Sequence, residues 1–557
     1  MEEPADDRSF DAAWKALCSP LHQATTKEEI EQAALRRTCT VEDMMEYWNC
    51  LNVKYKSIPT IHITGTKGKG STACFCSALL SPSSDADDES RTKIGLFTSP
   101  HLLYVGERIR INGKPISKAL FAQVYWDVRD RLDSKQKQLP GYFRMLTLMA
   151  LYVFQQLKVD VQILEVGMGG RYDATNVISQ LQTRQRVCGV TLLDYDHVRI
   201  LGNTLAQIAW EKGGIFGRTS GNSKNSTSKE EVSPHPSKDQ DHYSKIQIDR
   251  AYMKVDTLEQ TQKEDETATF FILDSNPDEV LQVMTSCAQV EGQGGRLKLI
   301  DADGAELRLQ FQSLGLKGDH QWGNAQLAVA LCRQLIQQTS NTTTTNLTMN
   351  LSNLQTAKWP GRCQHEFYKH KSKDTILELV LDGAHTPASL QTTLDFYQSI
   401  HSKNVQKQQH VLIFYTSPER NPVELLQLIA TMKVQFHTVY MVPPTSGKPS
   451  PVTPSSAQAL LEQHGIPIQT DLLPPSNSST WQATLASIWK HLVSSTSGMT
   501  VISNKNSLSS ILDELTTMDD NDTLSVLVTG SLYLVGSMLQ AMEWTEATTD
   551  DAILLQQ

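Results

Sequence analysis

Short apolar runs alternate with segments of helical period through the first part of the chain. Thr60 to Gly65 is typical of a short buried strand, and the apolar segment Ser71 to Leu80 that follows predicts a helix. Lys93 to Ser99 and Val159 to Val166 predict two further buried strands, and a helix through Phe143 to Gln156 leads to the second of them. Strand, helix and strand in this order favour a parallel sheet with helices on its faces.

The same alternation returns in the last third of the chain. Four short apolar runs predict strands, at Ile376 to Leu381, Val411 to Thr416, Thr438 to Val442 and Leu524 to Thr529. Helix-period segments at Pro387 to Ile400 and Pro422 to Met432 lie between them. We therefore expect an α/β protein with two domains, a larger one over residues 1–357 around a mostly parallel sheet and a smaller Rossmann-like one over residues 358–557.

Polar segments interrupt this pattern. Residues 81–92 are polar and residues 217–245 are rich in Ser, Lys and Asp, so we expect surface insertions, the second of them a flexible loop that builds no core. The Thr/Asn run at 339–350 is of the same kind. By contrast, Asn112-Gly113 lies between alternating apolar and polar residues and predicts a tight β-hairpin.

Composition and charge narrow the function classes. The formal net charge of -10 over 557 residues argues against broad binding of nucleic acid. The longest apolar runs, such as Leu146 to Phe154, fall short of the roughly 20 residues that a membrane span needs. The scattered cysteines and the acidic start MEEPADDRSF favour a reducing compartment without a leader segment. We expect a cytoplasmic monomer, with a mitochondrial pool from another start site left open.

The stretch IHITGTKGKGST, from Ile61 to Thr72, has the character of a phosphate-binding loop. Its glycines allow backbone N–H groups to turn inward, Lys69 can reach terminal phosphates, and the helix that follows contributes its dipole. Gly70 after Lys69 departs from the common GxxxxGK[ST] spacing, and a lysine-bearing surface turn is the alternative. The loop alone does not choose between a kinase, a GTPase and a ligase.

Polar residues follow several of the predicted strands, where ligands gather in open α/β sheets. Glu165 ends one strand and offers the hard oxygen ligands that Mg²⁺ prefers, although it could also cap the glycine turn after it. Ser99 ends another strand. His197 follows an acidic pair, where a structural histidine is the alternative, and Lys212 reads equally well as a solvated helix lysine.

The C-terminal part contains two more candidates of this type. Arg362, in Trp-Pro-Gly-Arg, offers a planar and always charged fork for phosphate. Asp382 follows a predicted strand and can accept a hydrogen bond from a ribose hydroxyl. Neither residue identifies a ligand when it is considered alone.

Taken together, the motifs resemble the folylpolyglutamate synthase family, within the muramyl-ligase-like superfamily of ATP-dependent amide-forming ligases. They are GTKGKGS at 65–71, LFTSPHL at 96–102, ERIRINGKPIS at 107–117, EVGMGGRYDATNV at 165–177, DH at 196–197, LGNTLAQIAWEKGGIF at 201–216, HQWGNAQLA at 320–328, WPGR at 359–362, LDGAHT at 381–386 and VTGSLYLVG at 528–536. The resemblance runs from about residue 40 to about residue 540, and several long motifs in one order are more specific than any one of them. It implies a P-loop ATPase-like N-terminal domain.

The resemblance also implies roles for individual residues. It assigns the ATP phosphates to Gly65, Thr66, Lys67, Gly68, Lys69, Gly70 and Ser71, and magnesium to Ser99, Glu165 and His197. Arg362 and Asp382 would reach the same ATP from the other domain, with Asn324 on the adenine side. Lys69, Lys212 and His385 are the implied catalytic residues; Lys212 would be carbamylated and hold a second metal, with a monovalent cation as a further ligand.

The implied reaction uses ATP to add L-glutamate to the γ-carboxyl of a reduced folate through an acyl phosphate. The alternatives are a dihydrofolate synthase and a catalytically inactive nucleotide-binding homologue. Two departures motivate the last: Gly106 where relatives commonly carry arginine, and Pro418 in place of a glycine; Gly217-Arg-Thr in place of Lys-Pro-Gly is a third departure from the family pattern.

Overall fold

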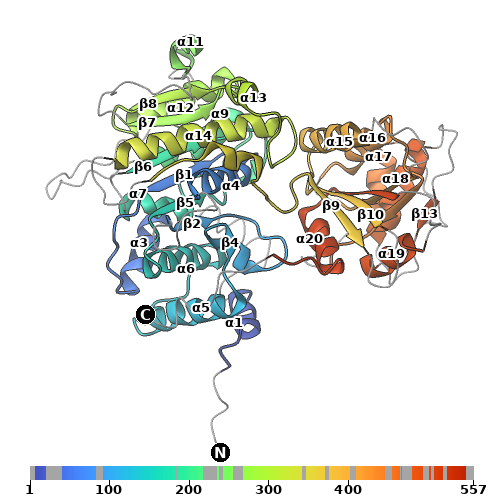
Figure 1. Cartoon of the computed structure of the whole chain (residues 1–557), viewed down its shortest axis with the longest axis horizontal. Coiled ribbons are helices and arrows are strands. Elements are labelled where there is room, and N and C mark those ends of the chain that lie inside the picture. Colours follow the sequence, from blue (N-terminus) through green and yellow to red (C-terminus); the bar gives the residue numbers. More distant parts are fainter. Residues whose placement is uncertain are drawn as a thin grey trace, which may run out of the picture.

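The computed structural model describes most of the chain. The described residues are 7–19, 40–82, 92–181, 185–217, 235–236, 243–254, 268–340, 347–369, 376–401, 409–418, 420–445, 454–464, 466, 480–493, 501–503, 507–517 and 524–546. Two separate sheets organise them into two lobes that lie side by side (Figure 1). We call the elements from α1 to η5 the first lobe and those from β9 to α20 the second lobe.

Eight strands form the first-lobe sheet within the described residues, in the order β4-β3-β2-β5-β1-β6-β7-β8. They are β1 (Thr60–Thr64), β2 (Ile94–Phe97), β3 (Ile109–Ile111), β4 (Lys114–Pro115), β5 (Val161–Glu165), β6 (Arg186–Val190), β7 (Thr269–Leu273) and β8 (Arg296–Ile300). All pair in parallel except β3 and β4, which form an antiparallel hairpin at the edge. Asn112 and Gly113 turn this hairpin with positive φ angles of 49° and 78°, which confirms the predicted tight turn.

Helices cover both faces of this sheet (Figure 1). They are α1 (Phe10–Leu17), α3 (Thr40–Cys50), α4 (Lys69–Leu80), α5 (Lys118–Asp133), α6 (Tyr142–Gln156), α7 (Ile178–Leu181), α8 (Val198–Leu201), α9 (Leu205–Gly213), α11 (Arg250–Met253), α12 (Asp278–Val290), α13 (Ala305–Gln310) and α14 (His320–Thr339), with 3₁₀ turns η2 (Val105–Arg108), η3 (Ala174–Val177), η4 (Gly214–Phe216) and η5 (Leu351–Gln355). Ile61 and Ile63 of β1 share one apolar core with Phe75 of α4 and Leu331 of α14. This core therefore fixes β1, and the C-terminal end of β1 leads into the glycine-rich loop that begins at Gly65.

The second lobe repeats the design on a smaller scale. Its sheet runs β13-β12-β11-β14-β10-β9, parallel except for the antiparallel edge strand β9. The strands are β9 (Gln364–Lys369), β10 (Ile376–Leu381), β11 (Gln409–Phe414), β12 (Thr438–Met441), β13 (Val501–Ser503) and β14 (Leu524–Thr529), and the helices are α15 (Pro387–His401), α16 (Pro422–Ala430), α17 (Pro454–Gln463), α18 (Thr480–Val493), α19 (Leu508–Leu515) and α20 (Leu532–Ala541).

Several contacts in one region join the two lobes. Leu102 of the first lobe is buried in the apolar core of the second lobe. Arg110 of β3 places Nη1 2.7 Å from Glu546 Oε1, beyond α20, and its guanidinium stacks 4.8 Å from the ring of Trp359 between the lobes. Leu102, Arg110, Trp359 and Glu546 together form what we call the fixed contact.

The α/β class with a mostly parallel sheet and a smaller second lobe is confirmed. The predicted strands and helices are present with shifted ends; the helix predicted from Ser71, for example, begins at Lys69. The predicted strand set omitted β6, β7, β8, β9 and β13. Within the described residues, no helix combines the length and apolar character required to span a bilayer.

The insertion predicted at 81–92 lies almost wholly outside the described residues, as does most of 217–245. The prediction that 217–245 builds no core is wrong for Tyr243, which is 4% exposed and belongs to an apolar cluster with residues of α9 and α12. His235 also lies edge-on to Trp210, with ring centroids 4.8 Å apart. Two aromatic side chains within the polar segment therefore anchor it to the first lobe.

Candidate functional site

The phosphate loop turns sharply at the end of β1 because two of its residues are glycines. Gly65 has φ 145° and Gly68 has φ 90°, a region that side chains rarely adopt. An added Cβ would lie 1.8 Å from Thr191 Oγ1 at Gly65 and 2.4 Å from Asn324 Oδ1 at Gly68. The loop is therefore held between β6 and α14 at a distance that only glycine permits.

Lys69 begins α4 and folds back over the loop. Its Nζ donates to Gly65 O at 3.1 Å and to Thr66 O at 3.4 Å. The first N–H groups of a helix have no intrahelical acceptor, and the helix dipole adds positive potential there. The ammonium and the N-terminus of α4 thus converge on one point, which is the arrangement that binds a phosphate.

Thr66 and Lys67 make their hydrogen bonds to the segment after β6, whereas the Lys69 ammonium lies over the loop itself. Their N–H groups donate to Leu192 O at 2.9 and 3.1 Å, and Lys67 Nζ lies 2.6 Å from Asp194 Oδ2. The resemblance placed both residues among the phosphate ligands. In the structure these groups tie the loop to the segment after β6 instead.

Lys212 lies beneath the loop. It is 4% exposed on α9, and its Nζ donates to Gly65 O at 2.7 Å. Burial lowers the pKa of this amine well below its usual value, and the nearby charge of Lys69 lowers it further. A solvated helix lysine, the alternative left open by the sequence, is therefore excluded.

Glu165, at the end of β5, borders the loop on its other side. Its carboxylate is 3% exposed and accepts a hydrogen bond from the Ser99 N–H at 2.9 Å. Burial raises the pKa of Glu165, while Lys69, the Ser99 N–H and Arg362 act in the opposite direction. The carboxylate is thus held next to cations that favour its charged form.

A narrow cavity of about 30 Å³ joins these residues to the second lobe. Gly70, Ser99, Glu165 and Arg362 line it, together with the fixed-contact residue Arg110. This volume accommodates about two water molecules or one ion. Three residues predicted for phosphate or metal, Ser99, Glu165 and Arg362, therefore meet in one place although they come from both lobes.

His197 lies elsewhere on the rim and does not line this cavity. Its side chain is half exposed, and its Nε2 lies 3.8 Å from Asp196 Oδ2. Partial burial lowers the pKa of His197, opposed by Asp196. Within the described residues, no three His, Cys, Asp or Glu side chains are grouped to hold a metal ion, so the set of Ser99, Glu165 and His197 stays a prediction.

Asp382 fixes the second-lobe side of the gap. Its Oδ2 accepts a hydrogen bond from the Cys363 N–H at 2.6 Å and its Oδ1 from the Ala384 N–H at 2.8 Å. The carboxylate therefore holds the segment with Arg362 against the end of β10. The sequence analysis did not predict this positioning role. The contact of Asp382 with a ribose hydroxyl stays a prediction.

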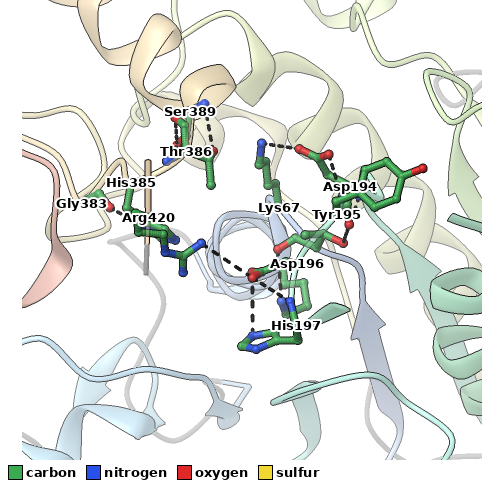
Figure 2. A network of polar contacts seen from close by, with 12 residues as sticks. Lys67, Asp194, Tyr195, Asp196, His197, Gly383, His385, Thr386, Ser389 and Arg420 are labelled. Carbon is green, nitrogen blue, oxygen red and sulfur yellow. Dashed lines mark hydrogen bonds and ion pairs between the residues drawn. The ribbon is translucent and has the colours of Figure 1, made fainter. Parts of the chain in front are cut away.

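His385 and Arg420 complete the second-lobe side (Figure 2). His385 Nδ1 lies 2.8 Å from Gly383 O, and burial lowers the pKa of its imidazole. Arg420 Nη1 lies 3.8 Å from Asp196 Oδ1 of the first lobe. Local sequence patterns do not predict this pairing, because 224 positions, the difference between 420 and 196, separate the two residues along the chain.

Asn324 is placed against the phosphate loop. It is 3% exposed on α14, and its Nδ2 donates to Gln321 Oε1 at 3.1 Å. Gln321 in turn donates to Ser71 Oγ at 3.3 Å. Asn324 and Gln321 support the loop from the side of α14, and the adenine-side role of Asn324 stays a prediction.

Gly106, one of the departures from the family pattern, has a local explanation. An added Cβ would lie 2.5 Å from the ring of Tyr104 and 2.7 Å from Ile116 O. Tyr104 also donates its hydroxyl to Ile116 O at 2.7 Å. Tyr104 thus occupies the space that a side chain at position 106 would need.

Fold and site together define a two-lobed α/β protein in which a glycine-rich loop of one lobe faces arginines in the loops of the other. Comparison with known proteins gives the same class. "Probable folylpolyglutamate synthase" of Schizosaccharomyces pombe is 30% identical over 75% of this chain and 73% of its own length. Folylpolyglutamate synthase of Saccharomyces cerevisiae is 28% identical over 90% of this chain and 81% of its own.

Solved structures give the same fold. Folylpolyglutamate synthase of Thermotoga maritima superposes with a TM-score of 0.57 at 20% identity, over 90% of this chain and 93% of that one. The Mycobacterium tuberculosis enzyme of that name gives 0.57 at 20% identity, over 93% and 100%. No family model matches the sequence. The chain belongs to the folylpolyglutamate synthase family.

Proposed function

We propose that this protein is an ATP-dependent ligase that adds L-glutamate to the γ-carboxyl of tetrahydrofolate and of its polyglutamates. The observation that carries the proposal is the convergence of Lys69, Glu165 and Arg362 on one gap in a member of this family. Related proteins with this fold are described as complexes with ADP and AMPPCP, and one as a complex with AMPPCP and folate. These descriptions support a nucleotide and a folate as the ligands here.

The nucleotide phosphates would bind between the lobes. The N-terminus of α4 and the Lys69 ammonium provide positive charge on one side, and the Arg362 guanidinium provides it on the other. Positive groups placed around the transferring phosphoryl stabilise the charge that spreads over its oxygens. Because this gap is lined by residues of both lobes, the lobes would adjust around the nucleotide as it binds.

The reaction needs an activated carboxyl, because a carboxylate does not condense with an amine at neutral pH. A γ-carboxylate oxygen of the folate attacks the γ-phosphorus, the bond to the bridging oxygen breaks, and ADP leaves. The amino group of L-glutamate then attacks the acyl carbon, and inorganic phosphate leaves as the amide forms. In this proposal His385, whose pKa is lowered by burial, would accept the proton that the amine loses.

Ser99 and Glu165 fit a magnesium ion. Both line a cavity large enough for an ion, the Ser99 N–H donates to the Glu165 carboxylate, and hydroxyl and carboxylate oxygens are hard donors of the kind that Mg²⁺ prefers. A bound Mg²⁺ would supply charge neutralisation for the phosphoryl group. His197 would join this set from the rim, on the neighbouring 191–197 segment.

Lys212 has the chemistry needed for carbamylation. Only a neutral amine adds to carbon dioxide, and the lowered pKa of Lys212 increases its neutral fraction. The product would carry a carboxylate next to Gly65, where a second metal or a monovalent cation could neutralise it. We propose this modification together with the predicted cytoplasmic location and monomeric state.

The test is an assay of purified protein with ATP, Mg²⁺ and L-glutamate. Tetrahydrofolate and dihydropteroate are offered separately, and ADP release and product mass are measured. Glutamate-dependent ADP release with tetrahydrofolate supports the proposal. Release with dihydropteroate alone indicates a dihydrofolate synthase, and no release with either acceptor indicates the inactive homologue.

A further inference from the structure

A short segment after β6, residues 191–197, is attached to the phosphate loop along its length. Leu192 O accepts the N–H groups of Thr66 and Lys67, and Thr66 Oγ1 donates to Asp194 O and accepts from the Asp194 N–H, both at 3.1 Å. The Lys67–Asp194 ion pair at 2.6 Å adds a further link. Any displacement of this segment is therefore passed directly to the loop.

The far end of the segment reaches the second lobe. Asp196 Oδ1 accepts the His197 N–H at 2.9 Å, and the same oxygen lies 3.8 Å from Arg420 Nη1 (Figure 2). Figure 2 shows Arg420 extending from the second lobe toward Asp196, with the Lys67–Asp194 pair above Asp196 in this view. Asp196 thus stands between a second-lobe cation and the backbone that places His197.

The contact has the properties of a closing contact. Arg420 and Asp196 are 34% and 26% exposed, and their separation of 3.8 Å exceeds a hydrogen bond. Within the described residues, the Arg420 guanidinium forms an ion pair with the side chain of Asp196. Exposed ion pairs contribute little to stability, about 0–1 kcal/mol, so a positioning role explains this pair better than a stabilising one.

We propose that Arg420 is a positioning residue that couples lobe closure to the phosphate loop. When the lobes close on a nucleotide, Arg420 draws Asp196 toward the second lobe, and the 191–197 segment then holds the loop and His197 in their bound arrangement. Arg420 acts through Asp196 and does not touch the nucleotide. This inference rests on the nucleotide-binding part of the proposed function.

Hydrogen–deuterium exchange tests the coupling without turnover. Wild-type protein, Arg420→Ala, Arg420→Lys and Lys433→Ala are compared with and without a non-hydrolysable ATP analogue. Lys433 is an exposed cation of the second lobe between α16 and β12, so its variant matches the loss of charge. We expect the analogue to slow exchange in peptides 65–71 and 191–197 of the wild type and of Lys433→Ala.

In Arg420→Ala we expect that protection of 191–197 is largely lost and that kcat falls at least tenfold, whereas Arg420→Lys restores most of both. Melting temperatures of the free variants should agree, because the pair is exposed. Unchanged protection of 191–197 in Arg420→Ala overturns the inference. If kcat nevertheless falls in this variant, Arg420 contacts a substrate directly; if kcat also stays the same, Arg420 has no role in the reaction. Absence of protection in the wild type would instead reject nucleotide binding itself, and so distinguishes failure of the proposed function.

Discussion

The two sides of the gap are built differently. On the first-lobe side, Lys69 and Lys212 donate to carbonyl oxygens of the phosphate loop, and Glu165 accepts a main-chain hydrogen bond. On the second-lobe side, Arg362 and Arg420 extend toward the first lobe and depend on how the lobes meet. The first side is therefore preorganised within one lobe, whereas the second is assembled by closure.

The two sides also hold their charges differently. Burial raises the pKa of Glu165 and lowers the pKa of Lys212, and the charge of Lys69 lowers both pKa values. The protonation states of the first-lobe groups therefore depend on one another. The second lobe contributes arginines, which stay charged at any accessible pH. The buried first-lobe groups thus face two arginines and the titratable His385 of the second lobe, and variants on each side should fail in different ways.

Lys69→Ala should give the largest loss. Removing a preorganised charge from the transferring phosphoryl is expected to lower kcat by about 10²–10³-fold. The measurement is glutamate-dependent ADP release, with circular dichroism to verify folding. Lys67→Ala, two residues away, should lose less activity, because the Lys67 ammonium pairs with Asp194 and acts on the loop only through the 191–197 segment. Equal losses in the two variants would show that the orientation of Lys67 given by the structure is not the one used in catalysis.

Arg362→Ala tests the second-lobe side. Loss of one hydrogen bond to a charged group should lower kcat/KM by about 10–100-fold. Because Arg362 meets the first lobe only when the lobes approach, we expect the effect in kcat more than in the affinity of the open protein for nucleotide, measured by calorimetry. Arg362→Lys should recover only part of the activity, since lysine lacks the planar fork. Full recovery would mean that charge alone is required.

The sequence predicts the first side far better than the second. Gly65, Gly68 and Lys69 lie within a few residues of one another after a strand, so their convergence is a local consequence of β1 leading into α4. Glu165 follows because β5 pairs with β1 in parallel and Ile63 is in register with it. Lys67 shows the limit of this reasoning, because its partner Asp194 is 127 positions away.

The second side depends on contacts that no local pattern encodes. Asp196 and Arg420 meet only because two separately folded lobes dock. Leu102 looks like an ordinary loop leucine, yet it is buried in the core of the other lobe. The order of motifs indicates that both lobes contribute to a site, but lobe docking, set by packing, decides which side chains face each other.

Leu102→Ala tests how far the second side depends on the fixed contact. Truncating a buried leucine costs about 2–5 kcal/mol, and we expect the lower end because Leu102 is 9% exposed. Urea denaturation measures the loss. Leu103→Ala, at a partly buried neighbour on the same core, is the control and should cost less. If the second side depends on lobe docking, Arg362→Ala should lower kcat/KM less in the Leu102→Ala background than in the wild type, because Arg362 is already displaced there.

If the losses of kcat/KM, expressed as free energies, simply add in the double variant Leu102→Ala/Arg362→Ala, this dependence is contradicted. Sites that share no partner usually add within about 0.5 kcal/mol, so a larger deviation reports coupling. The same cycle with Lys69→Ala in place of Arg362→Ala should be additive, since Lys69 is held within the first lobe.

The smallest expected effect concerns acid and the strand beneath the first side. His62 on β1 is fully buried; its Nε2 lies 2.9 Å from Thr175 Oγ1, and its Nδ1 has no partner in the described residues. Burial, with the charge of Arg186, lowers its pKa from 6.5 to about 3. Between these values the unfolded chain binds a proton that the folded chain refuses, so the stabilisation is complete above pH 6.5 and is lost as pH falls toward 3.

Stability should therefore fall by up to about 1.4 kcal/mol per pH unit through this group. His62→Gln removes the titration while keeping an amide near Thr175, so the difference in unfolding free energy between the variant and the wild type should change by about 1 kcal/mol between pH 6.5 and 5.5. The subtraction matters because His410 in the second lobe, whose pKa is lowered to about 4, contributes its own acid sensitivity. A pH-independent difference would show that His62 accepts a proton in the folded protein, and that the first side is less rigidly buried than its hydrogen bonds imply.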